Sequence, residues 1–424
     1  MADPIAYDIR AADYLDEAAV EKEMRRVFDI CHTCRRCLPL CPAFPDLFNR
    51  IDTGPTEEVD GLKTVDLRNV VDLCYQCKLC YNHCPYHPPH RWMVDFPRLM
   101  LRARASRAAA EGVPLQDKVL GRADLIGRIG SMLAPLSNLM NRVRLSRVLM
   151  EKTLGIHRNR NLLLFRRRRF SRWFRSRRSR AHAPDARVAL FATCTVEYNE
   201  PDIGIASVEV LERNGVEVSL PDQRCCGMPF LDGGDIERAK TLARRNVASL
   251  AKEVAEGRDI VVPGPTCSFT IRNEYPHLLG TEEARMVASR TMDISEYLMK
   301  RHDAGRLDTR FKQGPGRVGY HLPCHLKAQN IGFRSRDLLK LLPGTEVTMV
   351  DRCSGIDGTW GFKTQYFDLS LKVAKPLADE LDSARPDATA SDCPLACMQI
   401  QKMRGEKPLH PIQIVRRAYG EGAR

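Results

Sequence analysis

The spacing of hydrophobic residues predicts three different regions along the chain. In the first hundred residues, apolar side chains recur three or four positions apart, which is the spacing of one helix face. The clearest sets are Met24, Val27, Phe28 and Cys31, and then Leu67, Val70, Val71 and Cys74. No strand-like alternation interrupts them, so this part is predicted to be all-α.

A second region, from about residue 97 to residue 183, is predicted to form amphipathic helices. Its apolar residues occupy one helix face, interrupted by Pro135, and are Leu125, Ile129, Met132, Leu133, Leu136, Leu139, Met140 and Val143. The uncharged stretch 129–141 has 13 residues, whereas a membrane-spanning helix needs about 20 apolar residues. No transmembrane helix is therefore expected.

The third region, from Arg187 onward, alternates between strand-length and helical segments. Apolar runs of strand length lie at 188–193, 216–220, 259–264, 318–322 and 346–350, and helical stretches such as 202–213, 235–256 and 365–381 lie between them. Such alternation is typical of a parallel α/β arrangement with three layers.

The third region also repeats itself. Cys194, Cys225 and Cys267 recur as Cys324, Cys353 and Cys393, at offsets of 130, 128 and 126 residues. A period of this length indicates a duplicated domain rather than a solenoid. With a boundary between the copies near 307–316, the predicted domains are 1–97, 98–185, 186–310 and 311–424.

Composition narrows the class of protein. Hydrophobic residues make up 43% and charged residues 28% of the 424 positions, which excludes collagen-like and disordered architectures. The first 26 residues include 11 charged ones and lack the apolar core of a signal peptide, so a cytoplasmic location is expected. In that reducing environment, the 16 cysteines are expected to bind metal rather than to form disulfides.

The first eight cysteines form two copies of the motif C-x2-C-x2-C-x3-C-P, which start at Cys31 and at Cys74. In this motif three thiolates hold one cluster and the fourth binds the neighbouring one. The predicted fold is thus a two-cluster ferredoxin-like module, in which one [4Fe–4S] cluster is held by Cys31, Cys34, Cys37 and Cys84, and the other by Cys74, Cys77, Cys80 and Cys41. Structural zinc, the alternative, would use two separated C-x2-C pairs.

The repeats resemble a known family. Cys194, the string Cys225-Cys226-Gly227 and Cys267, with the strings PTCSFTIRNEYP, YHLPCHLKAQ, CSGIDGTWGFK and SDCPLACMQI, resemble the cysteine-rich CCG domain of heterodisulfide reductase-related iron–sulfur proteins. Joined behind a two-cluster module, the layout also resembles the iron–sulfur subunits that serve anaerobic glycerol-3-phosphate dehydrogenase and glycolate oxidase. The resemblance implies electron transfer from a flavoprotein dehydrogenase, or another redox protein, towards quinone.

The chain departs from the complete five-cysteine sets of that family, which hold noncubane clusters that cleave a disulfide. In the first repeat, Thr270 occupies the position at which that family has the last cysteine. In the second repeat, Ser354 replaces the second cysteine of the pair and Ala396 the last one. The remaining cysteines are candidates for a third and a fourth site with a further iron–sulfur cluster or zinc, namely Cys194, Cys225, Cys226 and Cys267, and then Cys324, Cys353, Cys393 and Cys397. Buried thiols left from an ancestral site are the alternative.

Other residues near these cysteines are weaker candidates. His321 and His325 flank Cys324, and ordinary polar contacts are a simpler interpretation than ligation or proton donation. The glycine stretches 227–234 and 355–361 would allow close approach to a cofactor, or form simple turns. No G-x-G-x-x-G follows a strand and no P-loop occurs, so bound flavin, NAD or nucleotide is not expected. No catalytic residue is assigned.

The basic charge of the chain is concentrated in one segment. The net charge is +13, and nine arginines lie within 166–180. Phe170, Trp173 and Phe174 lie among them, a mixture that suits an anionic membrane interface. An acidic partner, a solvated linker and, last, nucleic acid are the alternatives. Peripheral attachment to the inner face of the cytoplasmic membrane and docking on a partner are therefore the two favoured interpretations.

These features together predict an iron–sulfur electron-transfer subunit of an oxidoreductase rather than a stand-alone enzyme. It would relay electrons between a flavoprotein dehydrogenase and a quinone or other acceptor. Two alternative hypotheses stay open. One is a reductase that acts on a disulfide at a cluster between the repeats, and the other is a zinc-stabilised assembly scaffold.

Overall fold

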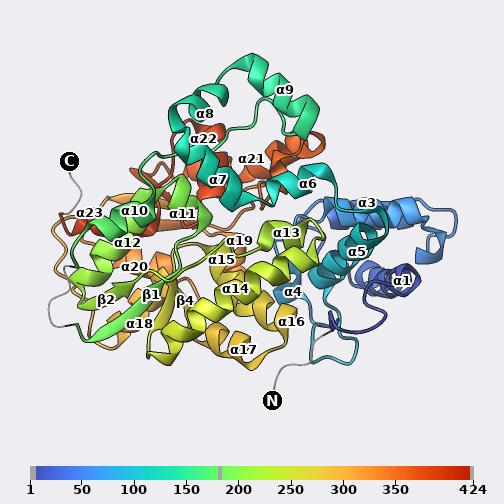
Figure 1. Cartoon of the computed structure of the whole chain (residues 1–424). Coiled ribbons are helices and arrows are strands. Elements are labelled where there is room, and N and C mark those ends of the chain that lie inside the picture. Colours follow the sequence, from blue (N-terminus) through green and yellow to red (C-terminus); the bar gives the residue numbers. More distant parts are fainter. Residues whose placement is uncertain (1–5, 180–183, 421–424) are drawn as a thin grey trace. The chain divides into compact units, whose positions relative to one another are not determined.

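A computed structural model describes residues 6–179 and 184–420 of the chain (Figure 1). The chain divides into two compact units. The first runs up to Gly121 and includes Pro229–Ala239, and the second comprises Arg122–Met228 and the chain from Lys240 onward. The ferredoxin-type cysteines therefore lie in one unit, and both cysteine-rich repeats lie in the other.

The first unit is built from helices, and none of its described residues forms a strand. Its elements are α1 (Glu17–Cys34), α2 (Ala43–Asp52), η1 (Val59–Gly61), α3 (Thr64–Leu73), α4 (Leu79–His83), α5 (Phe96–Glu111) and α6 (Leu115–Leu120), together with most of α13 (Met228–Asp232) and the start of α14 (Ile236–Ala255). Val27 and Leu67, from the two predicted helix faces, are fully buried. The rings of Phe44 and Phe96 meet at the centre, with centroids 4.7 Å apart. The all-helical prediction is thus confirmed.

The second unit contains two small parallel sheets. β1 (Ala186–Leu190), β2 (Val216–Ser219), β3 (Asp259–Val262) and β4 (Thr291–Asp293) lie in the order β2-β1-β3-β4, and β5 (Arg317–His321), β6 (Glu346–Val350) and β7 (Ala388–Ser391) lie in the order β6-β5-β7. All strand pairs are parallel, with Leu190 beside Val261 and His321 beside Ser391. The predicted parallel α/β character is confirmed.

The five predicted apolar runs all form strands, although the run 188–193 ends as a strand at Leu190. Two further strands, β4 and β7, are not predicted by the sequence. Their sequences, TMD and ATAS, are short and largely polar, and both strands lie at a sheet edge. Hydrophobic patterning therefore gave no signal for them.

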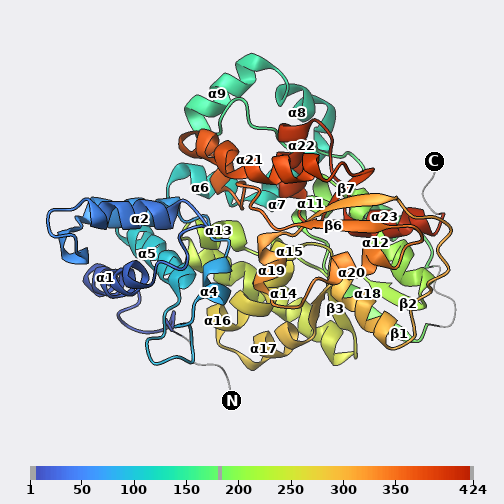
Figure 2. The same ribbon diagram turned by 180° about the vertical axis from the view of Figure 1, so that it is seen from behind.

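Helices connect and cover the strands of the second unit (Figure 2). They are α7 (Ala123–Met132), α8 (Ala134–Met140), α9 (Arg144–Leu154), α10 (Phe170–Ser176), α11 (Cys194–Tyr198), α12 (Pro201–Arg213), the remainder of α14, α15 (Pro265–Phe269), η2 (Thr270–Glu274), α16 (Tyr275–Leu279), α17 (Glu282–Ser289), α18 (Ile294–Asp303), α19 (Cys324–Ala328), α20 (Arg334–Lys340), η3 (Trp360–Phe362), η4 (Thr364–Tyr366), α21 (Phe367–Ser383), α22 (Pro394–Arg404) and α23 (Pro411–Ala418).

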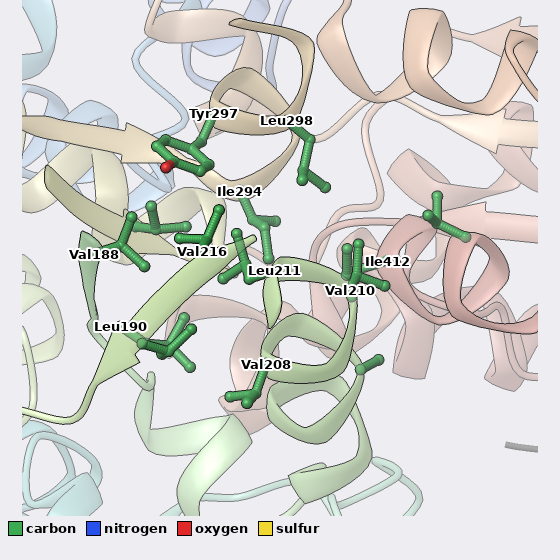
Figure 3. Close-up of a cluster of buried hydrophobic side chains, with 14 of the residues drawn as sticks. Val188, Leu190, Val208, Val210, Leu211, Val216, Ile294, Tyr297, Leu298 and Ile412 are labelled. Atoms are coloured by element: carbon green, nitrogen blue, oxygen red, sulfur yellow. The ribbon is translucent and has the colours of Figure 1, made fainter. Parts of the chain in front are cut away.

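One hydrophobic core joins the two repeats. Val188 and Leu190 of β1 and Val210 of α12 belong to the same buried cluster as Ile412 of α23 (Figure 3). Helix α23 follows the last strand of the second repeat, yet it packs on α12 of the first. The repeats therefore share a core instead of folding as separate globules.

Helices α7 and α8, together with Leu133 between them and Val143 before α9, expose the apolar face that the sequence predicts. Its eight large side chains, from Leu125 to Val143, are between 40 and 70% exposed. Small residues point inward on α7 instead. Gly127 lies against the ring of Tyr198 and Gly130 against that of Phe165, so closely that an added methyl group would come within 2.5 Å of ring carbons. Soluble helices normally bury their large apolar side chains, so this arrangement leaves an apolar surface uncovered.

None of the helices in the described part of the chain has the length and apolar character that crossing a membrane requires.

The aromatic residues of the arginine-rich segment correct one prediction. Phe170 is fully buried, and Trp173 and Phe174 pack against the same core. Gly204 of α12 makes room for Phe170, because a Cβ there would lie 2.6 Å from its ring. The prediction that these rings face a membrane is wrong. The composition of a segment does not reveal which of its side chains pack against the core. The last arginine of the segment, Arg180, lies outside the described residues.

Candidate metal centres

In the first unit, Cys84 lies with the first three cysteines of the other motif. Cys31 and Cys34 lie in the last turn of α1, which Arg35 ends in a left-handed conformation with φ of 50°. Burial raises the pKa of the Cys31 thiol, and the thiols of Cys37, Cys84 and Cys34 raise it further. Burial, and then Cys84 and Cys34, raise the pKa of Cys37 to about 12. The four sulfurs therefore form one group.

Cys41 lies with the first three cysteines of the second motif. Cys74, Cys77 and Cys80 are buried. Burial raises the pKa of Cys80 most, followed by the thiols of Cys77, Cys74 and Cys41. Cys37 of the first group also raises it. The two groups are thus near enough for their thiols to interact.

Polar side chains surround the second group. Gln76 donates to the sulfur of Cys74 at 3.4 Å, and Lys78, only 4% exposed, donates to Gln76 at 2.8 Å. Arg104 of α5 donates to the backbone carbonyls of Val71, at 2.9 Å, and of Cys74. Burial raises the pKa of Cys74, whereas Arg104 lowers it. The two cations therefore favour negative charge on this group.

Both groups suit iron–sulfur clusters. Each offers four thiols, the ligand number of a [4Fe–4S] cluster. Because burial and mutual repulsion raise the pKa values of Cys31 and Cys80, these sulfurs are disfavoured as bare thiolates, and bound iron would stabilise them. The structure groups the same cysteines as the motif does. Their role as ligands stays a prediction.

In the second unit, the four cysteines of the first repeat lie side by side. Cys194 opens α11 after β1, Cys267 lies in α15 after β3, and Cys225 and Cys226 lie in the loop after β2. Hydrogen bonds link the thiols in series: Cys225 donates to Cys194 and to Cys226, and Cys267 donates to Cys226. They assemble because the carboxyl ends of parallel strands meet at one edge of the sheet.

Asp124 of α7 joins this group, and sequence reasoning missed it. Its Oδ1 lies 3.5 Å from Cys194 Sγ, and its Oδ2 accepts a hydrogen bond from the backbone N–H of Cys225 at 2.6 Å. The hydrogen bond with Cys225 lowers the pKa of Cys194, but burial and Asp124 outweigh it, so that the pKa is raised. No motif could have found Asp124, because it precedes Cys194 by 70 residues in a helix that reads as apolar.

Cys226 is the most acidic thiol of the group. Hydrogen bonds from Cys225 and Cys267 lower its pKa well below the usual range, although burial opposes them. The hydroxyl of Thr270, which donates to the carbonyl of Thr266 at 2.7 Å, also lowers it. Thr270, at the position of the absent cysteine, therefore has its hydroxyl near the site.

Two fully buried side chains hold the loop that carries Cys225 and Cys226. Asn246 accepts from the N–H of Arg224 at 2.8 Å and donates to the carbonyl of Cys225 at 3.1 Å. Tyr275 donates to the carbonyl of Cys226 at 3.0 Å and accepts from Asn246 at 2.8 Å. This closed set of hydrogen bonds fixes where the two sulfurs lie.

The second repeat is arranged differently. Cys324 opens α19 after β5, and its Sγ lies 3.5 Å from Oδ2 of Asp357. Cys393 precedes α22 after β7. Burial, and to a smaller extent Asp357, raise the pKa of Cys393 to about 11. A hydrogen bond from the backbone N–H of Ala396 opposes this rise. Asp357 is thus the group that Cys324 and Cys393 have in common.

The remaining two cysteines of this repeat make local contacts. Cys353 accepts a hydrogen bond from the N–H of Gly355 at 3.3 Å. Cys397 is 4% exposed, and its thiol donates to the carbonyl of Ser391 at 3.5 Å. Burial, and then Cys393, raise its pKa. The one-residue shift of this cysteine therefore places its thiol against the end of β7.

The two histidines beside Cys324 have separate surroundings. The ring of His321 is buried, with Nδ1 2.9 Å from the hydroxyl of Ser391, and burial lowers its pKa to about 4. His325, also buried, has Nδ1 3.0 Å from Oγ1 of Thr266 and stacks on Phe269 with ring centroids 5.2 Å apart. His321 is a neutral residue of the core, whereas His325 lies between the two repeats.

Comparison with known domain families gives three matches along the chain. Residues 24–110 match the Citrate utilization protein B Fer4-like domain, and residues 188–272 and 318–401 each match the Cysteine-rich domain called CCG. A helical Fer4-like domain followed by two cysteine-rich domains defines the class of the protein, which is an iron–sulfur subunit that transfers electrons.

Curated relatives come from several organisms. A subunit of anaerobic glycerol-3-phosphate dehydrogenase from Escherichia coli (strain K12) is 30% identical over 307 residues, which cover 72% of this chain and 77% of the relative. A subunit of fumarate reductase (CoM/CoB) from Methanothermobacter marburgensis is 31% identical over 238 residues, covering 55% and 45%. Lactate utilization protein A of Geobacillus thermodenitrificans is 29% identical over 218 residues, covering 49% and 87%. The chain belongs to the CCG-domain iron–sulfur family that includes the glycerol-3-phosphate dehydrogenase subunit.

Proposed function

We propose that this protein relays electrons from a flavoprotein dehydrogenase towards a quinone at a membrane. The observation that carries the proposal is the grouping of eight thiols into two sets of four in the first unit. The sets interact through Cys37 and Cys80, which suits passage of single electrons from one set to the other. The substrate of the dehydrogenase would bind on another polypeptide.

The side chains around the second set are suited to this role. When bound, a [4Fe–4S] cluster supplies reversible one-electron transfer. Lys78 and Arg104 lie beside Cys74 and lower the pKa of its thiol, so they would also favour added negative charge. The burial of Cys74, Cys77 and Cys80 keeps water away from the sulfurs.

The ligand assignment is tested with two matched double variants. Cys34→Ala with Cys84→Ala removes two ligands of one cluster if ligation is crosswise, so about four irons per chain remain in the first unit. Cys34→Ala with Cys41→Ala then removes one ligand from each cluster and perturbs both. Anaerobic reconstitution, iron and sulfide counts and EPR of the reduced protein read the result. The opposite pattern would show that each motif binds its own cluster, and loss of neither signal would refute the assignment.

A third iron–sulfur centre in the first repeat extends the proposal. Four hydrogen-bonded thiols, with the carboxylate of Asp124 3.5 Å from Cys194, form a donor set for iron. Twelve or more irons per chain are then expected, rather than about eight. A count of eight that is unchanged by Cys226→Ala would exclude this centre.

One observation favours a second candidate function, the reduction of a disulfide. A cavity of about 390 Å³ reaches the first repeat's centre. Cys194 lines it, together with four arginines, Arg128, Arg169, Arg175 and Arg224, and three acidic residues, Asp124, Glu197 and Asp222. Arg128 and Arg175 are exposed, and arginines beside a metal centre would suit an anionic substrate. Turnover of an anionic disulfide with reduced dye, with a KM raised by Arg128→Gln, would support this candidate, and absence of turnover would reject it.

We further propose that the uncovered face of α7 and α8 binds an anionic membrane surface. The face is apolar and 40 to 70% exposed, and exposed arginines such as Arg122, Arg128, Arg142 and Arg144 accompany it. Apolar burial combined with basic charge is how amphipathic helices bind anionic lipids. This surface would bring the protein to its quinone.

A further inference from the structure

The second repeat brings three different donors together beside one another. The sulfur of Cys324, a ring nitrogen of His325 and a carboxylate oxygen of Asp357 all lie within 4.8 Å of one another. His325 is buried, and the other two residues are half-buried. Sulfur, imidazole nitrogen and carboxylate oxygen are the three ligand types that zinc accepts in proteins.

The distances suit a single small cation. Zinc–sulfur bonds of about 2.3 Å and zinc–oxygen bonds of about 2.1 Å, at a tetrahedral angle, place the sulfur and the oxygen about 3.6 Å apart. Cys324 Sγ and Asp357 Oδ2 are 3.5 Å apart. The donors therefore need only small side-chain movements to surround one ion.

Residues of the first repeat contact His325 and orient its ring. Cys324 and His325 begin α19 directly after β5. Thr266, 3.0 Å from Nδ1, and the stacked ring of Phe269 orient the imidazole. Metal-bound histidines are commonly oriented by such a second hydrogen bond.

The loop that carries Asp357 is tightly packed. Gly355 has φ of +64°, and a Cβ there would lie 2.3 Å from the carbonyl of Ser370 in α21. A Cβ at Gly361 would lie 2.6 Å from the carbonyl of Ile356. The glycines of this stretch thus serve close packing of the loop, and the packing presents Asp357 to Cys324.

The donor set also differs from that of the first repeat. There, four thiols are hydrogen-bonded in series. In the second repeat, Ser354 and Ala396 replace two cysteines, and the thiol of Cys397 donates to a backbone carbonyl. Iron–sulfur clusters depend on soft thiolate ligands, whereas mixed nitrogen, oxygen and sulfur sets suit zinc.

We infer that the second repeat binds one zinc ion through Cys324, His325 and Asp357. The ion ties the start of α19 to the loop after β6. The site is separate from the electron relay, so it stands or falls independently of the proposed function.

The test uses the full chain, purified with its iron, and measures zinc and iron in the same samples. The wild type is expected to hold about one zinc per chain. Asp357→Asn and His325→Gln should each weaken zinc binding, measured by competition with a chelator, at least tenfold. Asp124→Asn is the matched control, because it removes the corresponding carboxylate, 3.5 Å from Cys194, and should leave zinc unchanged.

Cobalt provides a spectroscopic readout. Co²⁺ in place of zinc should give a thiolate charge-transfer band that Cys324→Ala removes and tetrahedral d–d bands that Asp357→Asn shifts. Unchanged zinc affinity in both Asp357→Asn and His325→Gln would overturn the inference. So would a loss of about four irons in these variants, since it would show a cluster in this repeat. Circular dichroism identifies any variant that is misfolded. If Asp357→Asn is misfolded, Asp357→Glu, which keeps the carboxylate, should restore zinc binding.

Discussion

Membrane attachment through the uncovered apolar face allows a quantitative prediction. Met132, Leu136 and Leu139 are 70, 56 and 56% exposed. Their replacement by serine in one triple variant removes apolar surface without opening the core. Because surface substitutions of this kind change stability by about 0.5 kcal/mol or less, the variant should fold normally.

The size of the effect follows from the exposed surface. Full transfer of a leucine or methionine side chain out of water gains about 1.5–3 kcal/mol. With somewhat more than half of each side chain left to cover, each residue would contribute about 1 kcal/mol to membrane binding. The triple variant should therefore lose about 3 kcal/mol, which lowers the partition coefficient roughly a hundredfold.

Sedimentation with vesicles of anionic phospholipid measures the partition coefficient directly. Val65, 66% exposed on α3 of the first unit, provides the control, and Val65→Ser should bind as the wild type does. Binding that the triple variant retains in full would refute the idea that this face contacts lipid. A wild type that does not sediment with anionic vesicles would refute the membrane proposal as a whole.

Four further outcomes are expected. Replacement of Arg166–Arg169 by glutamine should release the protein from anionic vesicles at low salt, since each basic charge contributes about 1 kcal/mol; unchanged sedimentation would contradict this. Phe170→Ala should lower the free energy of unfolding by about 3–5 kcal/mol because the ring is fully buried, whereas Phe333→Ala, at an exposed position, should cost less than about 1 kcal/mol. Arg104→Gln should lower the reduction potential of the cluster at Cys74 by roughly 40–90 mV, which corresponds to a charge interaction of about 1–2 kcal/mol. An EPR-monitored redox titration measures this potential, and Arg104→Lys should restore most of it. Burial lowers the pKa of His410 to about 3, so the stabilising effect of the neutral ring is complete above pH 6.5 and falls as the pH drops towards 3. From pH 7.5 to pH 5 the free energy of unfolding should fall by about 2 kcal/mol for this reason. Urea unfolding of His410→Gln should lack that part of the pH dependence.

The predicted elements were those with a strong local pattern. The helix faces around Val27 and Leu67 and the five apolar strands formed where hydrophobic spacing indicated. β4 and β7 were missed because edge strands with polar sequences owe their formation to pairing with a neighbour, which the sequence of the strand does not encode. Phe170 was misread for a related reason, since an aromatic ring among arginines suits both a membrane and a core.

The candidate sites divide in the same way. Each C-x2-C-x2-C-x3-C-P run brings its first three thiols together through short-range geometry, so the motif alone indicates the chemistry. Asp124 and Asp357 could not be found, because they reach the first cysteine of each repeat, Cys194 and Cys324, from segments 70 and 33 residues away. No sequence motif links a single aspartate to cysteines at such separations.

By itself, the sequence determined the chemistry of the protein, its helical and α/β halves and its internal duplication, because cysteine spacing and hydrophobic period are properties of neighbouring residues. Only the tertiary structure decided that α7 turns glycines inward and its large apolar side chains outward. It also decided that Asp124 meets Cys194, and that His325 and Asp357 meet Cys324. These contacts depend on how distant segments pack, and packing is a sum over many weak interactions that no local pattern contains.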